Sequence, residues 1–475
     1  MGKRSDGRTL TAWLRSGQAM TGWQQAALVA RMSLPAVLAQ LTTILMEYID
    51  AAMAGSLGAQ ASASIGLVVS TTWLFGGLSA AASVGFSIQA AQQLGAGAVD
   101  EARYTLRQAI LVTTCFSLAL TLLGVLLSSS LPAWLGGEAG LQADASRYFL
   151  IYMCSLPAFQ LENLAGAMLQ SSGNMRTPAL LNTLMCLLDI FWNFFLIFPS
   201  RNLDVWGTVL WLPGAGMGVA GAALGTALAE VLTAILMLWA VGRGSSVLPV
   251  SLSDSWQISW KCLSRAAHLA LPVGAEHLMM CGAMVAVTKI VAPLGAAAIA
   301  ANSFAVTAES LCYMPGYGIA AAAAPLIGQS AGAGRLELIR KFARLTVGLG
   351  MLVMSIMAVL MYVMAPWVFA LLTPDFAVRE LGVQALRIEL FSEPLFAASI
   401  VAAGALRGAG DTLVPGIMNM ASIWLVRIPL SLWLVQYHGL AGVWLAMGIE
   451  LCCRGLFMLV RLYRERWLKQ MKIMT

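Results

Sequence analysis

The stretch QQLGAGAVDEARYTLR at residues 92–107 returns 237 residues later as QSAGAGRLELIRKFAR at residues 329–344. Outward from this stretch the same offset joins five further pairs: Leu34-Pro35 with Leu271-Pro272, Leu57-Gly58 with Leu294-Gly295, Pro157 with Pro394, Gly173 with Gly410, and Pro178 with Pro415. Chance matches would not keep one offset without a gap. Residues 34–178 and 271–415 are therefore two copies of one pattern, which is typical of an internally duplicated membrane transporter.

The composition indicates a membrane protein. The chain is 59% hydrophobic and 11% charged, whereas a soluble protein of 475 residues carries far more charge on its surface. Apolar stretches long enough to cross a bilayer core of about 30 Å follow one another along the chain. We predict twelve transmembrane helices, at about 27–54, 62–94, 104–130, 143–170, 176–199, 214–242, 264–293, 296–331, 342–371, 382–408, 412–436 and 439–463.

Six of these helices fall in each half. An even number leaves both halves in the same orientation, so the repeat is parallel. We predict an all-α membrane protein of two six-helix lobes, related by a pseudo-two-fold axis along the membrane normal. The predicted parts are a cytoplasmic or interfacial segment (1–26), an N-lobe (27–242), a cytoplasmic linker (243–263), a C-lobe (264–463) and a basic cytoplasmic tail (464–475).

The basic residues predict the orientation. Most of the 28 Lys and Arg residues lie in segments on one side of the predicted membrane, including both ends of the chain. The positive-inside rule then places both termini in the cytoplasm of a multi-pass protein of the cell inner (plasma) membrane. The net charge of +6 reflects this topology and anionic lipid rather than nucleic acid. Residues 9–26 suggest an interfacial helix, and no signal peptide is expected.

Several classes of function are excluded by missing motifs. The sequence has no G-x-x-x-x-G-K-[ST] loop, so we expect no ATP hydrolysis. Its three histidines form no H-E-x-x-H motif, which argues against an intramembrane metalloprotease. The eight cysteines have no metal-binding spacing and are expected to pack in helices. We expect a monomeric transporter without a cofactor, surrounded by membrane lipid, and not an enzyme.

Acidic residues inside the predicted helices are the candidate functional groups. A carboxylate in hydrocarbon costs at least a few kcal/mol, so each must face a cavity, pair with a base or stay protonated. Ten of the 22 acidic residues lie there: Glu47, Asp50, Glu162, Asp189, Glu230, Glu276, Glu309, Glu389, Glu393 and Glu450. A structural role near a helix end is equally compatible with Glu162, Glu230 and Glu450.

In the first half, four polar residues are expected to meet. Asp50 lies 15 residues beyond Pro35, about 22 Å along the helix, in the outer half of the bilayer. Asp189 and Asn193 share one face of the fifth helix, and Thr226 reaches a similar level from the sixth. Two carboxylates, an amide oxygen and a hydroxyl suit Na⁺ or a shared proton, so we predict cation coupling here.

The second half does not repeat these acids. At the 237-residue offset stand Val287, Val426 and Leu430 in place of Asp50, Asp189 and Asn193. Weaker candidates for coupling in the C-lobe are Glu276, Glu309, Glu389, Glu393 and Arg427. Because Glu389 and Glu393 share a helix face and Arg427 lies at a comparable depth in the next helix, we expect a structural Glu393–Arg427 ion pair.

Five motifs resemble those of the multidrug and toxic compound extrusion (MATE) transporters, over about residues 30–460. They are L-P-x-x-x-x-Q-L (34–41), D-x-x-M-A-G-x-L-G (50–58), Q-x-L-G-A-G (92–97), G-V-x-G-A-A-L-G-T (218–226) and A-L-R-G-A-G-D-T-x-x-P (405–415). The resemblance implies two lobes around a V-shaped cavity, and export driven by proton or sodium entry. Asp50 matches the first-helix aspartate of the family, and Thr226 its sixth-helix threonine.

The chain departs from the family pattern at two places. Archaeal-type members carry Asn and then Asp one turn apart in the fifth helix, whereas this chain has Asp189 and then Asn193. The acid that some members carry in the seventh helix is Met280 here, with Glu276 one turn earlier.

We therefore expect a cation-coupled antiporter that exports organic, cationic or amphipathic compounds, with the coupling ion left open between H⁺ and Na⁺. The 26 methionines suit a cavity that accepts varied shapes. A flippase for a lipid-linked glycan, or another specialised metabolite exporter of the same superfamily, is the alternative. A flippase would need a basic cavity, and only Lys289, Arg427 and Arg454 are bases within the helices. An intramembrane enzyme is the remote alternative.

Overall fold

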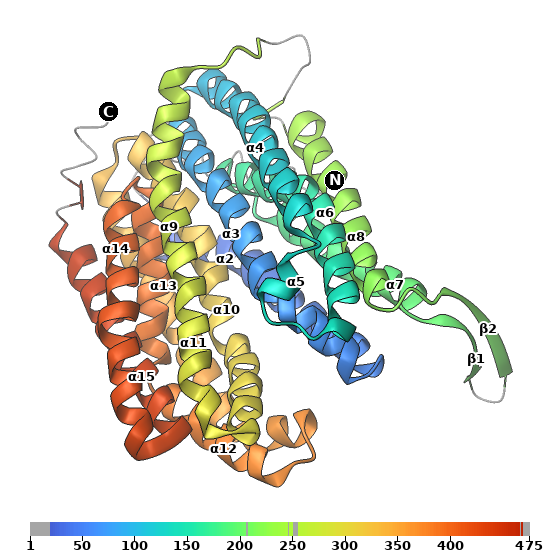
Figure 1. Ribbon diagram of the computed structural model, residues 1–475. Coiled ribbons are helices and arrows are strands. Elements are labelled where there is room, and N and C mark those ends of the chain that lie inside the picture. Colours follow the sequence, from blue (N-terminus) through green and yellow to red (C-terminus); the bar gives the residue numbers. More distant parts are fainter. Residues whose placement is uncertain (1–19, 206–207, 246, 250–254, 466, 469–475) are drawn as a thin grey trace.

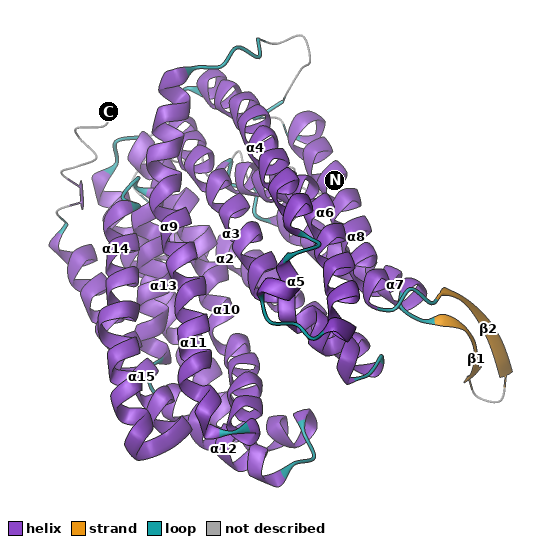
Figure 2. Ribbon diagram, viewed as in Figure 1, coloured by secondary structure: helices purple, strands orange, loops and turns teal. Residues whose placement is uncertain are grey.

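The computed structural model describes residues 20–205, 208–245, 247–249, 255–465 and 467–468. Over these residues the chain is helical except for short loops and one hairpin of two strands (Figures 1 and 2). The predicted interfacial helix at 9–26 lies mostly outside the described residues, as do parts of the predicted linker and of the basic tail.

The elements follow one another with few residues between them. The first half contains α2 (Gly22–Ser56), α3 (Ala59–Ala96), α4 (Val99–Leu127), α5 (Leu131–Trp134), α6 (Ala139–Ser171), α7 (Arg176–Leu196), β1 (Pro199–Val205), β2 (Thr208–Ala215), α8 (Val219–Trp239) and the π-helical turn η1 (Ala240–Gly244). The second half contains α9 (Trp260–Val291), the 3₁₀ turn η2 (Ala292–Leu294), α10 (Ala296–Gly332), α11 (Leu336–Leu372), α12 (Phe376–Glu389), α13 (Glu393–Gly408), α14 (Leu413–Ser422), the π-helical turn η3 (Ile423–Arg427) and α15 (Ile428–Arg464).

The twelve-helix architecture is confirmed. In the described part of the chain nine helices are long and apolar enough to span a bilayer, or ten if the bent pair α12 and α13 is one span. Gly439, at φ 56° and ψ −133°, interrupts α15 and divides the stretch from α14 to Arg464 into the last two spans. The remaining span is α6, whose 33 residues reach about 50 Å at 1.5 Å per residue.

The predicted helix at 382–408 is not continuous. It breaks between α12 and α13, which meet at an angle of 60°. Residues 390–392 form a turn, and Pro394 follows in the first turn of α13. Proline has no backbone N–H and fixes its φ, so it is tolerated at a helix start but not in a helix interior. The proline that the repeat pairs with Pro157 therefore stands at a helix start.

A hairpin of β1 and β2 joins α7 to α8 and was not predicted. Its antiparallel register pairs Pro199 with Ala215 and Val205 with Thr208, and it extends away from the helices (Figure 1). The guanidinium of Arg201 lies 4.6 Å from the ring centre of Phe194 in α7 and 4.2 Å from that of Phe198. These cation–π contacts attach the base of the hairpin to the end of α7.

Large apolar side chains cover the outside of the helices. In α11, Leu352, Ile356 and Val359 are all exposed and follow one another at three- to four-residue spacing, which places them on one face. In α4, Leu118 and Leu122 do the same. A soluble protein rarely exposes such continuous apolar faces, so they are the faces that contact lipid.

The two halves of the sequence form two lobes that lie side by side (Figure 1). Helix α2 packs on α10 of the other lobe, and α3 packs on α9 and α10. We name the membrane face at which α3 and α10 end, around residues 95–97 and 332–334, the Gly-Ala-Gly face. The opposite face, which carries β1 and β2, is the hairpin face.

Helices α3 and α10 touch backbone to backbone at the Gly-Ala-Gly face. A Cβ atom on Gly95 would lie 2.0 Å from the carbonyl oxygen of Gln329, and one on Gly332 would lie 1.8 Å from the carbonyl oxygen of Gln92. The two contacts are related by the 237-residue repeat. Each repeat contributes the same residues, as in a contact on a two-fold axis. Only glycine allows this approach, which explains why the motif is present in both copies.

Gly332→Ala is therefore expected to destabilise the protein. The added methyl group forces the two backbones apart, and overpacking of this kind costs about 1–3 kcal/mol or more. The measurement is the thermal unfolding temperature of the purified protein in detergent. Gly348→Ala in α11 is the matched control, because a Cβ there meets nothing within 4 Å. An unfolding temperature of Gly332→Ala equal to that of Gly348→Ala would contradict the packing argument.

Candidate functional site

Asp50, Asp189 and Asn193 meet inside the N-lobe, as predicted from the sequence. The amide nitrogen Nδ2 of Asn193 donates to Oδ1 of Asp50 at 2.9 Å and to Oδ2 of Asp189 at 3.1 Å. Asp189 and Asn193 stand one turn apart in α7, and their exposed fractions are 0% and 1%. One amide group thus bridges two carboxylates, one from α2 and one from α7.

Helix α8 closes this site from a third side. The hydroxyl of Thr226 lies beside the carboxylate of Asp189 and donates to the carbonyl of Ala222 at 3.2 Å. The neighbouring Gly225 faces the amide of Asn193, since a Cβ atom there would lie 2.1 Å from Asn193 Oδ1. All four predicted N-lobe residues therefore lie close together. The absence of a side chain at Gly225 leaves space for the side chain of Asn193.

The two aspartates have no basic partner in the part of the chain that the structure describes. Within the described residues neither Asp50 nor Asp189 forms an ion pair, and the buried atoms Asp189 Oδ1 and Asn193 Oδ1 lack hydrogen-bond partners. Two adjacent carboxylates in a poorly solvated place cannot both stay charged without compensation. A shared proton satisfies them, and so does a small cation held by the free oxygens. We call Asp50, Asp189, Asn193 and Thr226 the N-lobe site.

A second pair of buried acids lies in the same lobe. Glu162 in α6 and Glu230 in α8 are 8% and 3% exposed, interact electrostatically, and each has a buried Oε2 without a hydrogen-bond partner in the described part of the chain. The sequence left both open to a structural role. Glu230 follows Thr226 by one helical turn, and this spacing is a sequence signal for its place next to the N-lobe site.

In the C-lobe, three of the weaker candidates form a cluster. Carboxylate oxygens of Glu309, Glu389 and Glu393 lie within 4.8 Å of one another, and the three residues are 6%, 0% and 0% exposed. Glu389 and Glu393 flank the bend between α12 and α13. Ser392 in this bend donates to Oε1 of Glu389 at 2.9 Å, whereas both oxygens of Glu393 lack a partner among the described residues.

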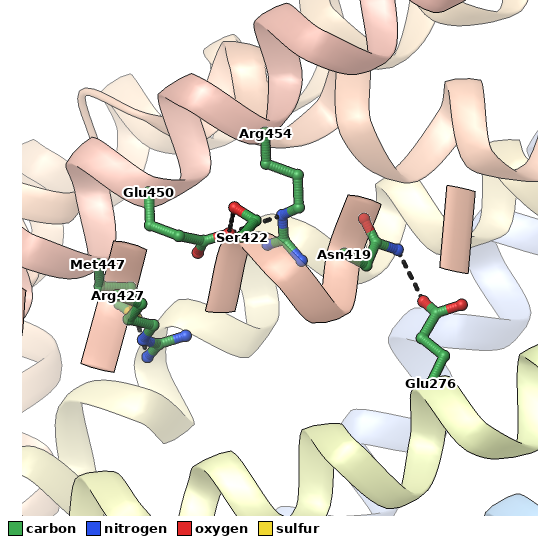
Figure 3. A network of polar contacts seen from close by, with 7 residues as sticks. All are labelled: Glu276, Asn419, Ser422, Arg427, Met447, Glu450 and Arg454. Atoms are coloured by element: carbon green, nitrogen blue, oxygen red, sulfur yellow. Dashed lines mark hydrogen bonds and ion pairs between the residues drawn. The ribbon is translucent and has the colours of Figure 1, made fainter. Parts of the chain in front are cut away.

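The expected Glu393–Arg427 ion pair is wrong. Arg427 points its Nη2 at the sulfur of Met447 instead (Figure 3), and the described residues contain no ion pair between Arg427 and Glu393. Two departures from straight helices explain the difference. The α12–α13 bend lies directly before Glu393, and Arg427 ends the π-helical turn η3, so spacing along straight helices does not place either side chain.

Glu276 stands apart from this cluster, in a pocket between the lobes. It accepts hydrogen bonds from Arg407 Nη2 at 2.6 Å and from Asn419 Nδ2 at 2.7 Å; Figure 3 shows the second of these. The pocket has a volume of about 240 Å³, and its lining includes Tyr317 and Arg454 as well as these three residues. The C-lobe candidates therefore belong to two different places.

Arg407 and Asn419 were not predicted from the sequence as residues of a site. Arg407 lies within the A-L-R-G-A-G-D-T motif. This motif is the sequence signal that could have indicated a role for Arg407. Near the pocket, Arg454 pairs with Glu450 at 3.2 Å, and Glu450 also accepts a hydrogen bond from Ser422 (Figure 3). Glu450 is thus a paired acid, in agreement with the structural role left open for it.

Comparisons with known proteins agree with this architecture. The sequence model of the MatE family matches twice, at residues 35–195 and 272–433, which together cover more than half of the chain. The chain is 24% identical to a probable multidrug resistance protein NorM of Thermotoga maritima, over 93% of this chain and 92% of that protein. It is also 24% identical to the multidrug resistance protein MdtK of Yersinia pestis, over 92% and 94%.

Solved structures show the same fold. A multidrug resistance MATE family transporter in an outward-facing conformation matches with a TM-score of 0.87 and 19% identity, over 99% of this chain and 100% of that one. A transporter of the MOP superfamily from Pyrococcus furiosus, described as having a binding pocket of reverse polarity, matches with a TM-score of 0.87 and 18% identity over the same shares. The predicted two-lobed, twelve-helix fold and the predicted family are confirmed.

Gly225→Ala is expected to disable the N-lobe site without unfolding the lobe. The new methyl group displaces the side chain of Asn193, which then loses its bonds to both aspartates. Dye efflux from cells that express the variant should fall by about tenfold or more, the scale on which small displacements disturb a functional site. The control is Gly166→Ala in α6, where a Cβ makes only an ordinary contact of 3.8 Å with Met237. Undiminished efflux by Gly225→Ala would argue against the site.

Proposed function

The chain belongs to the MatE family, and we propose that it exports organic, cationic or amphipathic compounds in exchange for H⁺ or Na⁺ by alternating access. The observation that carries the proposal is the N-lobe site. Two carboxylates from different helices share one amide and lack any basic partner in the described chain. Such a site gains or loses one positive charge at low cost, which is what coupling to a cation requires.

The charge state of Asp50 would affect how the two lobes pack on each other. Asp50 lies in α2, which packs on α10 of the other lobe. An uncompensated charge at Asp50 favours contact with water at the hairpin face, and a bound proton or Na⁺ removes that preference. The cation thereby biases α2 between two packings, and the equilibrium between lobe arrangements shifts with it.

The proposed orientation places the Gly-Ala-Gly face in the cytoplasm. Arg103, Arg340 and Lys341 lie near that face, within the first two turns of α4 and α11, and their charge agrees with the positive-inside rule. The hairpin of β1 and β2 then lies outside the cell. We propose a monomer in the plasma membrane with both termini inside and with the lobe boundaries at 27–242 and 264–463.

The pocket between the lobes is the proposed substrate site. Tyr317, Phe396 and Met280 offer aromatic and thioether surface for flat apolar groups. Glu276 is the lining carboxylate, and it is held by Arg407, whose side chain is 25% exposed. A cationic group of a substrate can take the place of Arg407 at Glu276. A compound that combines an apolar body with one positive charge fits both features.

Asp50→Asn is expected to abolish coupled export. The substitution keeps the shape of the side chain and removes a buried charge, so the protein should fold and bind dye as before. In proteoliposomes, dye export driven by an imposed sodium or pH gradient should fall by about tenfold or more, because the cation no longer distinguishes the two lobe arrangements. Asp189→Asn should act in the same direction.

The matched control is Asp100→Asn. Asp100 pairs with Arg103 at the surface, where its side chain is 94% exposed, and such pairs contribute little. Wild-type protein and the control should export dye under at least one of the two gradients. Export by Asp50→Asn at the wild-type rate would refute the N-lobe site and move attention to Glu309, Glu389 and Glu393. Export by the wild type under neither gradient would refute cation-coupled export.

Glu276→Gln is expected to weaken binding of organic cations by about tenfold, since a charge-assisted contact becomes a neutral one. Binding of an uncharged dye of similar shape should change little. Fluorescence titration of purified protein with the two dyes measures the difference, and Glu380→Gln on the exposed face of α12 serves as the control. Equal losses for the charged and the uncharged dye would show that Glu276 supports the pocket rather than recognises charge.

A further inference from the structure

Two glutamines related by the 237-residue repeat reach across the boundary between the lobes at the Gly-Ala-Gly face. Gln92 of α3 donates from Nε2 to the carbonyl oxygen of Gly408 in α13 at 3.4 Å. Gln329 of α10 donates from Nε2 to the carbonyl oxygen of Ser171 in α6 at 2.6 Å. One bond runs from the N-lobe to the C-lobe, and the other runs in the opposite direction.

The two bonds obey the same repeat as the sequence. Gln329 follows Gln92 by 237 residues, and Gly408 follows Ser171 by 237 residues. Donors and acceptors are therefore exchanged by the pseudo-two-fold axis. The backbone contacts of Gly95 and Gly332 lie beside them and obey the same relation. A pair of bonds placed around an axis in this way breaks together when the two lobes rotate apart at this face.

The surroundings of the two glutamines differ in one respect. Oε1 of Gln92 accepts a hydrogen bond from Arg265 Nη2 of α9 at 2.9 Å, so Gln92 bridges two helices of the other lobe. Gln329 is fully buried, and its Oε1 has no partner among the described residues. Gln329 therefore depends on Ser171 for its side-chain hydrogen bond. When this bond breaks, the side-chain amide of Gln329 is left unpaired unless water reaches it.

We propose that Gln92 and Gln329 form a latch that holds the lobes together at the Gly-Ala-Gly face and sets how often this face opens. We call the two bonds, to Gly408 and Ser171, the glutamine latch. The latch rests on the proposed alternating access, because transport requires this face to open in each cycle. Gln92 and Gln329 are not among the residues that line the pocket, nor do they belong to the N-lobe site, so they act by positioning the lobes.

The strength of the latch fits such a role. The net contribution of one hydrogen bond changes an equilibrium by about fivefold, and of two by about thirtyfold. A latch of this strength favours the closed arrangement of this face. A ligand that binds the open arrangement more tightly by a similar factor can reverse that preference. A stronger contact, such as a buried ion pair across the axis, would hold the face shut.

The test measures opening directly, without transport. Spin labels at Asp100→Cys and Glu337→Cys occupy exposed positions related by the repeat, in the first turns of α4 and α11. A second pair, Ser62→Cys and Ile299→Cys, is also exposed and reports on the hairpin face. Both pairs are placed in a background in which the eight native cysteines are replaced by alanine or serine. Double electron–electron resonance then gives the distance distribution at each face in lipid nanodiscs.

Methionine replaces each glutamine, because it has a similar length but donates no hydrogen bond. Gln329→Met should increase the population with a longer distance at the Gly-Ala-Gly face by about fivefold. Gln92→Met also loses the bond from Arg265 of the other lobe, so it should increase that population by about fivefold or more, and the double variant by about thirtyfold or more. The pair at the hairpin face should shift to shorter distances by the same fraction. The control is Gln93→Met, since Gln93 accepts a hydrogen bond from Thr105 of its own lobe at 2.8 Å.

Unchanged distances in the double variant would overturn the latch. So would an equal shift in Gln93→Met, since loss of packing in α3 would then explain the result. Export by the same variants separates the latch from the proposed function. A protein whose face opens more often but that exports nothing, even as wild type, keeps the latch and refutes the exporter. A working exporter with unchanged distances keeps the exporter and refutes the latch.

Discussion

The crossing of α3 and α10 at Gly95 and Gly332 is the contact on which the other features depend. Both helices end at this crossing, and the absence of a side chain lets their backbones meet on the axis between the lobes. The contact holds the lobes together at one membrane face. At the same boundary α2 lies on α10, the pocket around Glu276 lies between the lobes, and Gln92 and Gln329 reach the opposite lobe.

The duplication preserved this scaffold while the buried charges diverged. Asp50 and Asp189 in the first half correspond to Val287 and Val426 in the second. The C-lobe instead carries its cluster at Glu309, Glu389 and Glu393. Packing on the axis needs the same residue from both halves, because each half supplies one side of the contact. A charged site inside one lobe has no such requirement, so either copy could acquire or lose acids independently.

The sequence was sufficient where one regular helix, or the repeat, decided the geometry. Asp189 and Asn193 meet because four residues make one helical turn, and the depth of Asp50 follows from helix rise. Prediction from the sequence failed where helices depart from regular geometry. The turn at residues 390–392 and the π-helical turn η3 separate Glu393 from Arg427, and no periodicity in those segments announces either feature. The contacts of Arg407 and Asn419 with Glu276 depend on how three helices of the C-lobe pack, and the acceptors of the two glutamines depend on how the lobes pack. One sequence states neither.

Coupled exchange requires that one cation and one substrate exclude each other through the two arrangements of the lobes. Linkage makes this requirement measurable on purified protein at equilibrium. An organic cation is added to the protein in weakly buffered solution that contains Na⁺, and released protons and free Na⁺ are recorded during the titration. We expect the binding of one substrate molecule to release about one proton or one Na⁺. Substrate binding that releases neither ion would contradict coupled exchange.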